Sequence, residues 1–242
     1  MYTFLDNHKG VLAVMSEKED GNMKIRGMQK DDEAVQNRKK FCQKNDIDFD
    51  NVINACVTHS DVVEVITDTK KHYYNTVDAL VTKENGIYLT ITTADCFPVV
   101  LYEPKAQIIA IVHAGWRGVV TKIIPNTLDA MKNLGADLQN IEIEIGPGIS
   151  QENFDFGFEE MIEEFGSYNQ DQYIIKGSAI NKVKIDLEKI IYDQITACGA
   201  DENKINASNV CTFDNDRFFS ARRHGGDSFH AMMTVVGMRN DA

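Results

Sequence analysis

Residues 86–118, GIYLTITTADCFPVVLYEPKAQIIAIVHAGWRG, constrain the fold most, because they hold the longest run of β-branched and aliphatic residues in the chain. A run this apolar is typical of buried strands. Polar reactive groups interrupt it at two points, residues 94–96 and 113–118. A thiol, a carboxylate, an imidazole and a guanidinium at the ends of buried strands indicate a functional site.

The register of this segment can be predicted. We expect three strands, at residues 86–93, 97–102 and 107–112. A four-residue hairpin loop at 103–106 would join the last two and place Cys96 directly opposite His113. Directly opposed residues have Cβ atoms about 5 Å apart, close enough to share one metal ion or one proton. Pro98 cannot donate to the ladder, so we expect it at a sheet edge or at the start of its strand.

Strands and helices are mixed in the rest of the chain, without regular βαβ alternation. The patterns predict further strands at 11–15, 52–57, 62–66, 141–145, 182–185, 210–213, 218–221 and 231–236, and helices at 30–44, 119–135, 158–165 and 187–198. Pro125 lies inside the second helix, which either kinks there or ends so that a new helix begins near it. Short connections favour antiparallel pairing. We therefore expect an α+β fold of mixed, largely antiparallel sheets, in one domain over residues 1–242.

Charge and cysteine usage exclude several classes of protein. A formal net charge of -12 argues against nucleic acid and anionic membranes as partners. No stretch reaches transmembrane length, and the N-terminus lacks the basic and apolar regions of a signal peptide. The odd number of cysteines, without a C-x-x-C pair, favours a reduced, cytoplasmic location. They are Cys42, Cys56, Cys96, Cys198 and Cys211.

Cys96 has three interpretations. A buried structural thiol is the usual one, and we assign it to Cys42, Cys56 and Cys198. A nucleophile paired with His113 would resemble the Cys-His hydrolases. However, a neighbouring carboxylate such as Asp95 raises a thiol pKa, whereas a bound cation deprotonates the thiol. The sequence therefore favours a metal ligand.

A catalytic zinc typically has three protein ligands and one open position. His59 is the best third ligand, because it also follows a buried strand, although alone it would be read as an exposed loop imidazole. The other histidines lie in polar or loop-like surroundings; they are His8, His72, His224 and His230. The absence of a His-x-His pair and of the H-x-E…P-C-x-x-C signature argues against a multicopper cluster and a zinc nucleobase deaminase of that type.

A second candidate group could bind an anion. Gly115, Trp116 and Arg117 join a strand to a predicted helix, where glycine lets a ligand approach the backbone and amide groups with a nearby arginine suit an anion. Trp116 could stack on a ring, although packing is the commoner outcome. Arg222 could bind the same anion or form ordinary surface pairs. The pattern is neither a P-loop nor a dinucleotide fingerprint.

Four motifs, TTADCFPVVLY, VHAGWRG, IGPGIS and FFSARR, occur in this order between residues 92 and 223. In sequence and spacing they resemble the laccase-domain family, over roughly residues 34–223. Members of that family have been called polyphenol oxidases and peptidoglycan editing factors, and are now described as multifunctional purine nucleoside phosphorylases. The chain departs from the family around the first histidine, where Val57, Thr58 and Ser60 replace the usual residues of Gln-Val-His-Gly, and after Arg223, where Gly-Arg is usual.

The resemblance implies a sandwich of two sheets flanked by helices, with zinc, or copper, held by His59, Cys96 and His113. It also implies phosphorolysis of adenosine, inosine and methylthioadenosine, and deamination of adenosine. Arg117, Arg222 and the turn at 115–118 would then bind phosphate, and a metal-activated water would carry out the deamination. Asp95 would orient a ligand or transfer a proton.

Three alternatives to this enzyme stay open at the level of sequence. One is a metal-free hydrolase or amidase that uses Cys96 and His113. Another is a copper-dependent polyphenol oxidoreductase, and the last is a non-enzymatic relative in which the metal is structural.

Overall fold

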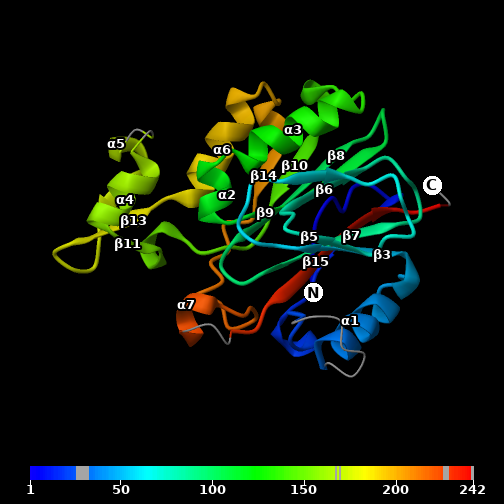
Figure 1. The fold of residues 1–242 in the computed structure, drawn as a ribbon, viewed down its shortest axis with the longest axis horizontal. Helices are drawn as coiled ribbons and strands as arrows, with labels where there is room; N and C mark the ends of the chain where they lie inside the picture. Colours follow the sequence, from blue (N-terminus) through cyan, green and yellow to red (C-terminus); the bar gives the residue numbers. More distant parts are fainter. Residues whose placement is uncertain (26–32, 167, 169, 226–228, 241–242) are drawn as a thin grey trace.

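Two six-stranded sheets form the centre of the molecule (Figure 1). The computed structural model describes residues 1–25, 33–166, 168, 170–225 and 229–240. In spatial order the first sheet contains β1 (Tyr2–Thr3), β2 (Val11–Met15), β15 (Met232–Met238), β7 (Tyr88–Thr93), β3 (Val52–Cys56) and β5 (Tyr73–Asn75). The second contains β14 (Ile205–Ala207), β10 (Glu142–Ile145), β8 (Phe97–Glu103), β9 (Ile108–Ala114), β6 (Ala79–Thr82) and β4 (Val63–Val65).

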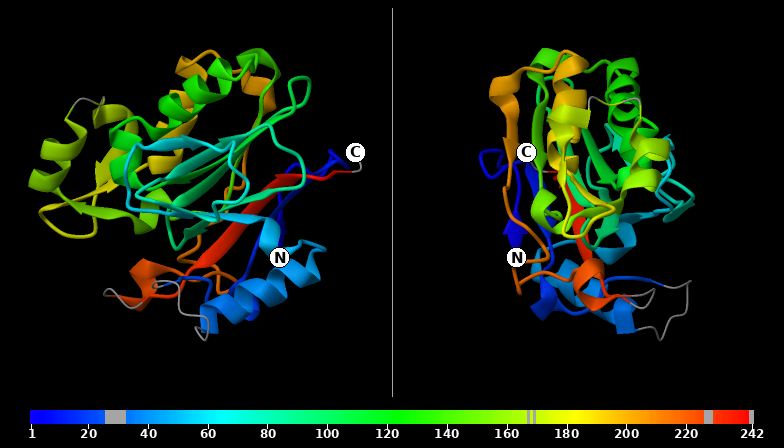
Figure 2. Two further views of the ribbon diagram at one scale, coloured as in Figure 1. Left: turned by 45° about the vertical axis from the view of Figure 1, so that its right-hand side comes forward. Right: turned by 90° about the vertical axis from the view of Figure 1, so that its left-hand side faces the viewer.

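The sheets pack face to face and helices cover their outer faces (Figure 2). Because side chains alternate along a strand, Val100 and Tyr102 of β8 point into the core between the sheets, while Val99 and Leu101 point out. The outward set packs on α3 (Ile123–Asn133) and α6 (Leu187–Ala197), which cover the second sheet. On the first sheet, α1 (Glu33–Lys44) buries Phe41 and Cys42. The predicted mixed sheets and the helix-flanked sandwich are confirmed, and most of the ladders are antiparallel.

Pro125 begins a helix rather than kinking one. The chain leaves α2 (Trp116–Val120), passes through Lys122 in the left-handed region at φ 78°, and enters α3. Pro125 is the third residue of α3, where its missing N–H has no intrahelical acceptor to lose. The second of the two alternatives for this segment is therefore correct. The first residues of the helix predicted at 30–44, up to residue 32, lie outside the described residues.

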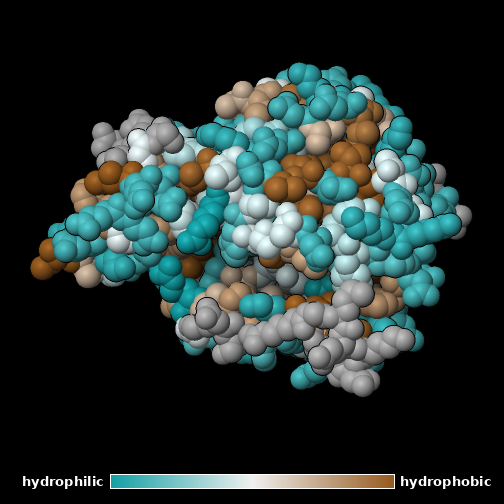
Figure 3. All heavy atoms as spheres, viewed as in Figure 1, coloured by the Kyte–Doolittle hydropathy of each residue, from teal (hydrophilic) through white to brown (hydrophobic). Residues whose placement is uncertain are grey.

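A small module projects from one end of the sandwich (Figure 1). It consists of β11 (Asp155–Gly157), β13 (Lys182–Ile185) and β12 (Ile174–Lys176) with α4 (Phe158–Phe165) and α5 (Gln170–Tyr173). Apolar surface gathers at its outer end (Figure 3), and its exposed large apolar residues are Phe158, Ile162, Ile175 and Ile180. Short 3₁₀ turns occupy Lys18–Asp20, Phe49–Asn51, Leu138–Asn140, Gln151–Asn153 and Glu202–Lys204.

The strands predicted at 210–213 and 218–221 are wrong. In the first, only Cys211 makes an isolated bridge, to Gly148. In the second, Ser220 is the N-cap of the short helix α7 (Ala221–His224), and its hydroxyl accepts a hydrogen bond from the Arg223 amide. Short apolar runs bury side chains without fixing a strand, and here the capping serine decides the local structure.

The hairpin between β8 and β9 has a register two residues away from the predicted one. Pro98, rather than Cys96, lies opposite His113, and Glu103 is still paired, with Ile108. The Glu103 side chain accepts the Ala106 amide, so the loop begins after Glu103 and occupies 104–107. The predicted direct pairing of Cys96 with His113 is therefore wrong. A shift of two residues nevertheless keeps both side chains on the same face of the sheet.

Three neighbouring parallel strands place the loops that matter for function. β3 lies between β5 and β7 and runs parallel to both, with Cys56 opposite Asn75 and Asn54 opposite Thr90. The carboxyl ends of these three strands therefore lie side by side. Open α/β sheets bind ligands just beyond the carboxyl ends of their strands. In the described part of the chain no helix is long and apolar enough to cross a membrane.

Candidate metal centre

His59, Cys96 and His113 converge just beyond the carboxyl ends of β3 and β7. One ligand atom from each lies within 4.8 Å of the other two, and no other such group of His, Cys, Asp and Glu occurs among the described residues. His59 Nε2 lies 3.6 Å from Cys96 Sγ, and the two imidazole rings are 4.8 Å apart and nearly perpendicular. Two imidazoles and one thiol, with a side left open, form a donor set that suits zinc and also copper.

Each ligand comes from the end of a buried strand. His59 lies three residues beyond β3 in the left-handed region, at φ 62°, and Cys96 lies three residues beyond β7. His113 is the buried penultimate residue of β9 in the other sheet. The strand ends of two different sheets thus supply one donor set.

Gly115 makes room for the three donors. A Cβ atom on Gly115 would lie 2.6 Å from His59 Cδ2, 3.1 Å from Cys96 Sγ and 3.2 Å from His113 Cε1. A side chain at this position would therefore push the donors apart. The sequence predicted Gly115 as a phosphate-binding residue; in the structure its backbone forms the floor beneath the donors.

Asp78, which the sequence analysis missed, orients His113. Its carboxylate is fully buried and accepts a 2.7 Å hydrogen bond from His113 Nδ1. With Nδ1 donating to the carboxylate, Nε2 keeps its lone pair for a metal. A single carboxylate inside the apolar segment NTVDALVT, just before β6, was the signal that could have found it.

The same carboxylate holds the loop that carries His59. It accepts the backbone amides of Thr58, His59 and Ser60, the last two at 2.9 and 2.8 Å. It also accepts both neighbouring hydroxyls, that of Ser60 at 2.6 Å. Thr58 and Ser60, two of the residues at which the chain departs from the family, therefore both bind Asp78. These bonds stabilise the left-handed backbone of His59.

The charges of the centre favour a thiolate. Burial raises the pKa of Cys96, but the nearby His113 and His59 outweigh it and lower the pKa to about 6. Burial lowers the pKa of His113, but Cys96 and Asp78 raise it to about 9. Burial also acts to raise the pKa of Asp78, yet hydrogen bonds from His113 and Ser60 hold it well below its usual range. The two imidazoles, and not the neighbouring Asp95, therefore determine the direction of the Cys96 pKa shift.

Asp95 faces the C-terminal part of the chain. It is buried at φ 83°, and its carboxylate accepts the Thr212 hydroxyl at 2.7 Å, the Ser220 hydroxyl at 3.0 Å and the Arg222 amide at 2.7 Å. These bonds tie the Cys96 loop to the segment before α7. The orientation of a ligand, which the sequence offered as one role for Asp95, is provided by Asp78.

The side chains of the predicted anion-binding residues make separate contacts and do not form one cluster. Arg222 donates to the Asp155 carbonyl at 3.3 and 3.4 Å. Arg117 is exposed and stacks on Trp116 at 4.2 Å, with no ion pair among the described residues. Trp116 itself packs edge-on against Phe156 at 5.1 Å. Of the two outcomes considered for Trp116, the structure shows packing.

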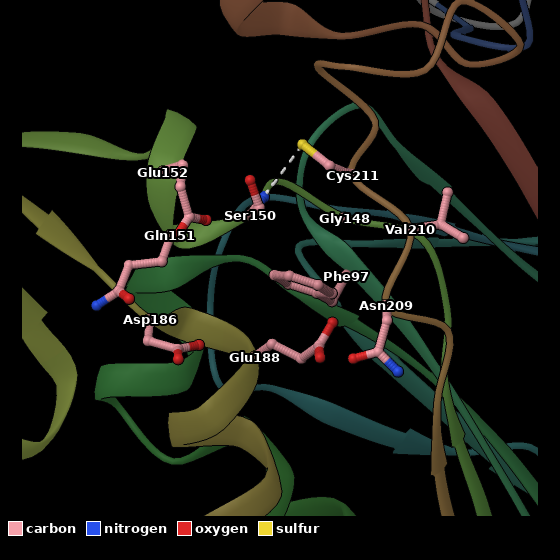
Figure 4. A pocket seen from close by; sticks show the side chains of 10 residues that line it. All are labelled: Phe97, Gly148, Ser150, Gln151, Glu152, Asp186, Glu188, Asn209, Val210 and Cys211. Carbon is pink, nitrogen blue, oxygen red and sulfur yellow. Dashed lines mark hydrogen bonds between the residues drawn. The ribbon is translucent and has the colours of Figure 1, made fainter.

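Two cavities of opposite character adjoin these loops. The larger, of about 640 Å³, lies at the carboxyl ends of β3, β5 and β7 and has two cations and no carboxylate in its wall. Its lining residues are Lys24, Ile25, Arg38, Asn54, Ala55, Cys56, Val57, Thr58, Tyr73, Asn75, Thr76 and Thr92. The smaller, of about 230 Å³, is acidic (Figure 4); around Phe97 it collects Glu152, Asp186 and Glu188.

Known proteins are similar to this chain in both sequence and fold. A family model described as multi-copper polyphenol oxidoreductase laccase matches residues 3–239. Adenosine deaminase RL5, from an unknown prokaryotic organism, is 35% identical over 193 residues, which are 75% of this chain and 73% of that protein. A purine nucleoside phosphorylase of Bacteroides thetaiotaomicron is 40% identical over 153 residues, 62% of this chain and 56% of that protein.

Solved structures extend the likeness to nearly the whole chain. YlmD from Geobacillus stearothermophilus superposes with a TM-score of 0.87 at 21% identity, covering 96% of this chain and 93% of that one. A Neisseria meningitidis protein, NMB0706, gives a TM-score of 0.82 at 21% identity and covers 99% of both chains. At such identities the likeness establishes the fold.

Proposed function

The chain belongs to the multi-copper polyphenol oxidoreductase laccase family, and from that premise we propose that it is a zinc-dependent purine nucleoside phosphorylase with adenosine deaminase as a second activity. Its substrates are adenosine, inosine and methylthioadenosine, with phosphate as the second substrate. The observation that carries the proposal is the convergence of His59, Cys96 and His113 beside a carboxylate-free cavity. The names of two relatives, an adenosine deaminase and a purine nucleoside phosphorylase, support the choice of reactions.

Zinc fits the donor set better than a multicopper cluster does. The described residues offer three donors at one position, and a second group of donors that could hold another ion is absent from them. Zinc bound there would supply a positive charge and an open coordination position, the chemistry that activates water for deamination. Copper at the same site, and with it a polyphenol oxidoreductase, is the alternative that the family description favours.

The chain's own residues divide the remaining work. Asp78 fixes the tautomer of His113 and the position of His59. We assign phosphate binding to Arg117 and Arg222, whose guanidinium groups carry no ion pair among the described residues, together with the amides of the turn at 115–118. Asp95 holds the Cys96 loop and could accept or return a proton.

We also propose that residues 1–242 work as one metal-dependent domain, in the cytoplasm and without a nucleic-acid or membrane partner. The net charge of -12 supports the absence of polyanionic partners. The odd number and wide spacing of the five cysteines support the compartment.

A second candidate is a metal-free Cys-His hydrolase or amidase. One observation favours it: the pKa of Cys96 is lowered to about 6 and that of His113 is raised to about 9, which gives a thiolate–imidazolium pair without any metal. In the third candidate, a non-enzymatic relative, the metal would be structural only.

One set of assays separates these candidates. Protein purified without chelator is analysed for metals and incubated with adenosine, inosine and methylthioadenosine, with and without phosphate. We expect about one zinc per chain and phosphate-dependent release of free base. Absence of metal together with rapid alkylation of Cys96 at neutral pH would indicate the hydrolase, and bound metal without base release would indicate the non-enzymatic relative.

The ligand assignment has its own test. Cys96→Ala should lose both stoichiometric zinc and base release, whereas Cys198→Ala, a matched change outside the centre, should keep both. Full zinc content in Cys96→Ala would place the metal elsewhere.

A further inference from the structure

The larger cavity lies where three parallel strands end. Cys56 of β3 is opposite Asn75 of β5, and continuing the register of β3 with β7 places Thr92 in the same row. All three residues line the cavity. The next residues along each strand lead to a functional loop, since β3 leads to His59, β5 to Asp78 and β7 to Cys96. Thr58 lines the cavity and directly precedes His59, so the cavity adjoins the loop that carries this donor.

The size of this cavity and the mixture of apolar and polar groups in its lining suit a nucleoside-sized ligand. Its volume of about 640 Å³ lies in the range of small-molecule sites, which are mainly apolar with a few polar groups. Ile25, Ala55 and Val57 supply apolar wall, while Asn75 and Thr92 supply polar groups. Neither of these two side chains has a hydrogen bond within the described residues, so both are available to a ligand.

The acidic cavity is the poorer choice for the same ligand. Glu152, Asp186 and Glu188 surround a volume of only about 230 Å³ (Figure 4), and burial raises the pKa of Glu188. Phe97, in its wall, lies opposite Ala114 on the outer face of the second sheet, whereas His113, the neighbour of Ala114 in β9, points to the other face because side chains on a strand alternate. The Phe97 wall of the acidic cavity is therefore on the other face of the sheet from the His113 donor.

We propose that the larger cavity binds the purine base of the nucleoside, with the ribose directed past Thr58 to the metal centre and Asn75 at the edge of the base. This inference rests on the proposed function. An asparagine amide both donates and accepts, so it can pair with N6 and N7 of adenine, or turn over and donate to O6 of hypoxanthine. One residue would thus accept both adenosine and inosine.

Cys56 provides a direct test, because it is an exposed thiol in the wall of this cavity. Zinc-loaded protein is treated with N-ethylmaleimide, and the rate of labelling at each cysteine is read by mass spectrometry. Saturating inosine without phosphate should slow the labelling of Cys56 at least fivefold and leave Cys198 unchanged. Equal labelling with and without inosine would overturn the proposal, as would equal protection by inorganic phosphate alone, which would make the cavity an anion site.

Variants test the role of Asn75. Asn75→Ala should raise the KM for inosine and adenosine roughly five- to tenfold, the effect of one lost hydrogen bond, with zinc content unchanged. Asn75→Asp, which only accepts, should shift the ratio of kcat/KM values towards adenosine, whose amino group donates. Asn181→Ala, an exposed asparagine in the projecting module, is the matched control and should match the wild type.

The outcomes keep this inference separate from the proposed function. If the wild type releases base and Asn75→Ala has unaltered KM values, the proposed function holds and the proposed base-binding site is wrong. If the wild type releases no base, the proposed function is wrong. The labelling of Cys56 would still report whether a nucleoside binds in the larger cavity.

Discussion

Asp78 and Asp95 are both buried carboxylates beside the metal donors, yet they hold different parts of the molecule. Asp95 adjoins Cys96 in the sequence, but its carboxylate turns to Thr212, Ser220 and Arg222. Asp78 is 35 residues from His113 in the sequence and binds its ring directly. Nearness in sequence thus did not reveal the carboxylate that binds a donor ring directly.

The two carboxylates also differ in the donors that they accept. Asp78 accepts three backbone amides as well as the His113 ring N–H and the hydroxyls of Thr58 and Ser60, and a backbone amide cannot turn round to accept. Asp95 receives one amide and two hydroxyls, and a hydroxyl can rotate to accept instead. An amide side chain should therefore be tolerated at Asp95 and not at Asp78.

The largest effect is expected from Asp78→Asn. One oxygen cannot accept every donor, and the new NH₂ group would face N–H groups. We expect zinc affinity to fall about 10- to 100-fold and the free energy of unfolding of the metal-free protein to fall by about 3 kcal/mol. Competition with a chromogenic chelator and urea denaturation measure the two effects. Asp129→Asn, on the exposed face of α3, is the control, and a loss of less than twofold in Asp78→Asn would contradict the comparison.

Gly115→Ala disturbs the donors without touching either carboxylate. The new Cβ would lie 2.6 Å from His59 Cδ2, so the His59 loop has to move. We expect a loss of about tenfold in zinc affinity, about 1.4 kcal/mol, with a smaller change in the stability of the metal-free protein. The same chelator titration tests this. Unchanged affinity would mean that the loop moves freely and that the bonds to Asp78 do not hold it.

Asp95→Asn should separate stability from metal binding. The amide oxygen can still accept the Arg222 amide while the Ser220 and Thr212 hydroxyls rotate. We expect the free energy of unfolding to fall by about 1 kcal/mol and zinc affinity to stay close to that of the wild type. If Asp95→Asn and Asp78→Asn weakened zinc equally, the distinction between the two carboxylates would be lost.

Ser60→Gly should have the smallest effect. It removes the 2.6 Å bond from the Ser60 hydroxyl to Asp78 but keeps the amide bond, and it restores the glycine usual in the family. We expect a loss of about 0.5–1 kcal/mol in stability and little change in zinc affinity. Ser178→Gly, which removes an exposed hydroxyl that donates to Asp155, is the control and should lose less.

The sequence correctly predicted that the three donors lie together, although the predicted hairpin register was wrong. Cys96 and His113 were placed on one face of the hairpin, and a slip of two residues preserves the face. The slip itself was not predictable from periodicity, because the side chain of Glu103 decides where the loop begins. The layered fold followed from the apolar strands and from the family resemblance.

Asp78 and the end of the FFSARR motif show that a sequence pattern does not identify the tertiary partners of a residue. A buried carboxylate in an apolar segment has no visible partner until the strands are arranged, since its six donors come from the β3 loop and from β9. Likewise, the run at 218–221 is apolar enough for a strand, but Ser220 caps a helix. In both places tertiary contacts decide the outcome.

The donors belong to both sheets of the sandwich, since His59 and Cys96 follow strands of the first and His113 ends a strand of the second. A bound ion is therefore a cross-link between the two sheets at one edge, and its binding energy adds to the stability of the fold. At a free metal concentration a hundred times the Kd, this linkage contributes about 2.7 kcal/mol. The melting temperature should thus rise with the logarithm of metal concentration, so a chain starved of metal would be short-lived as well as inactive.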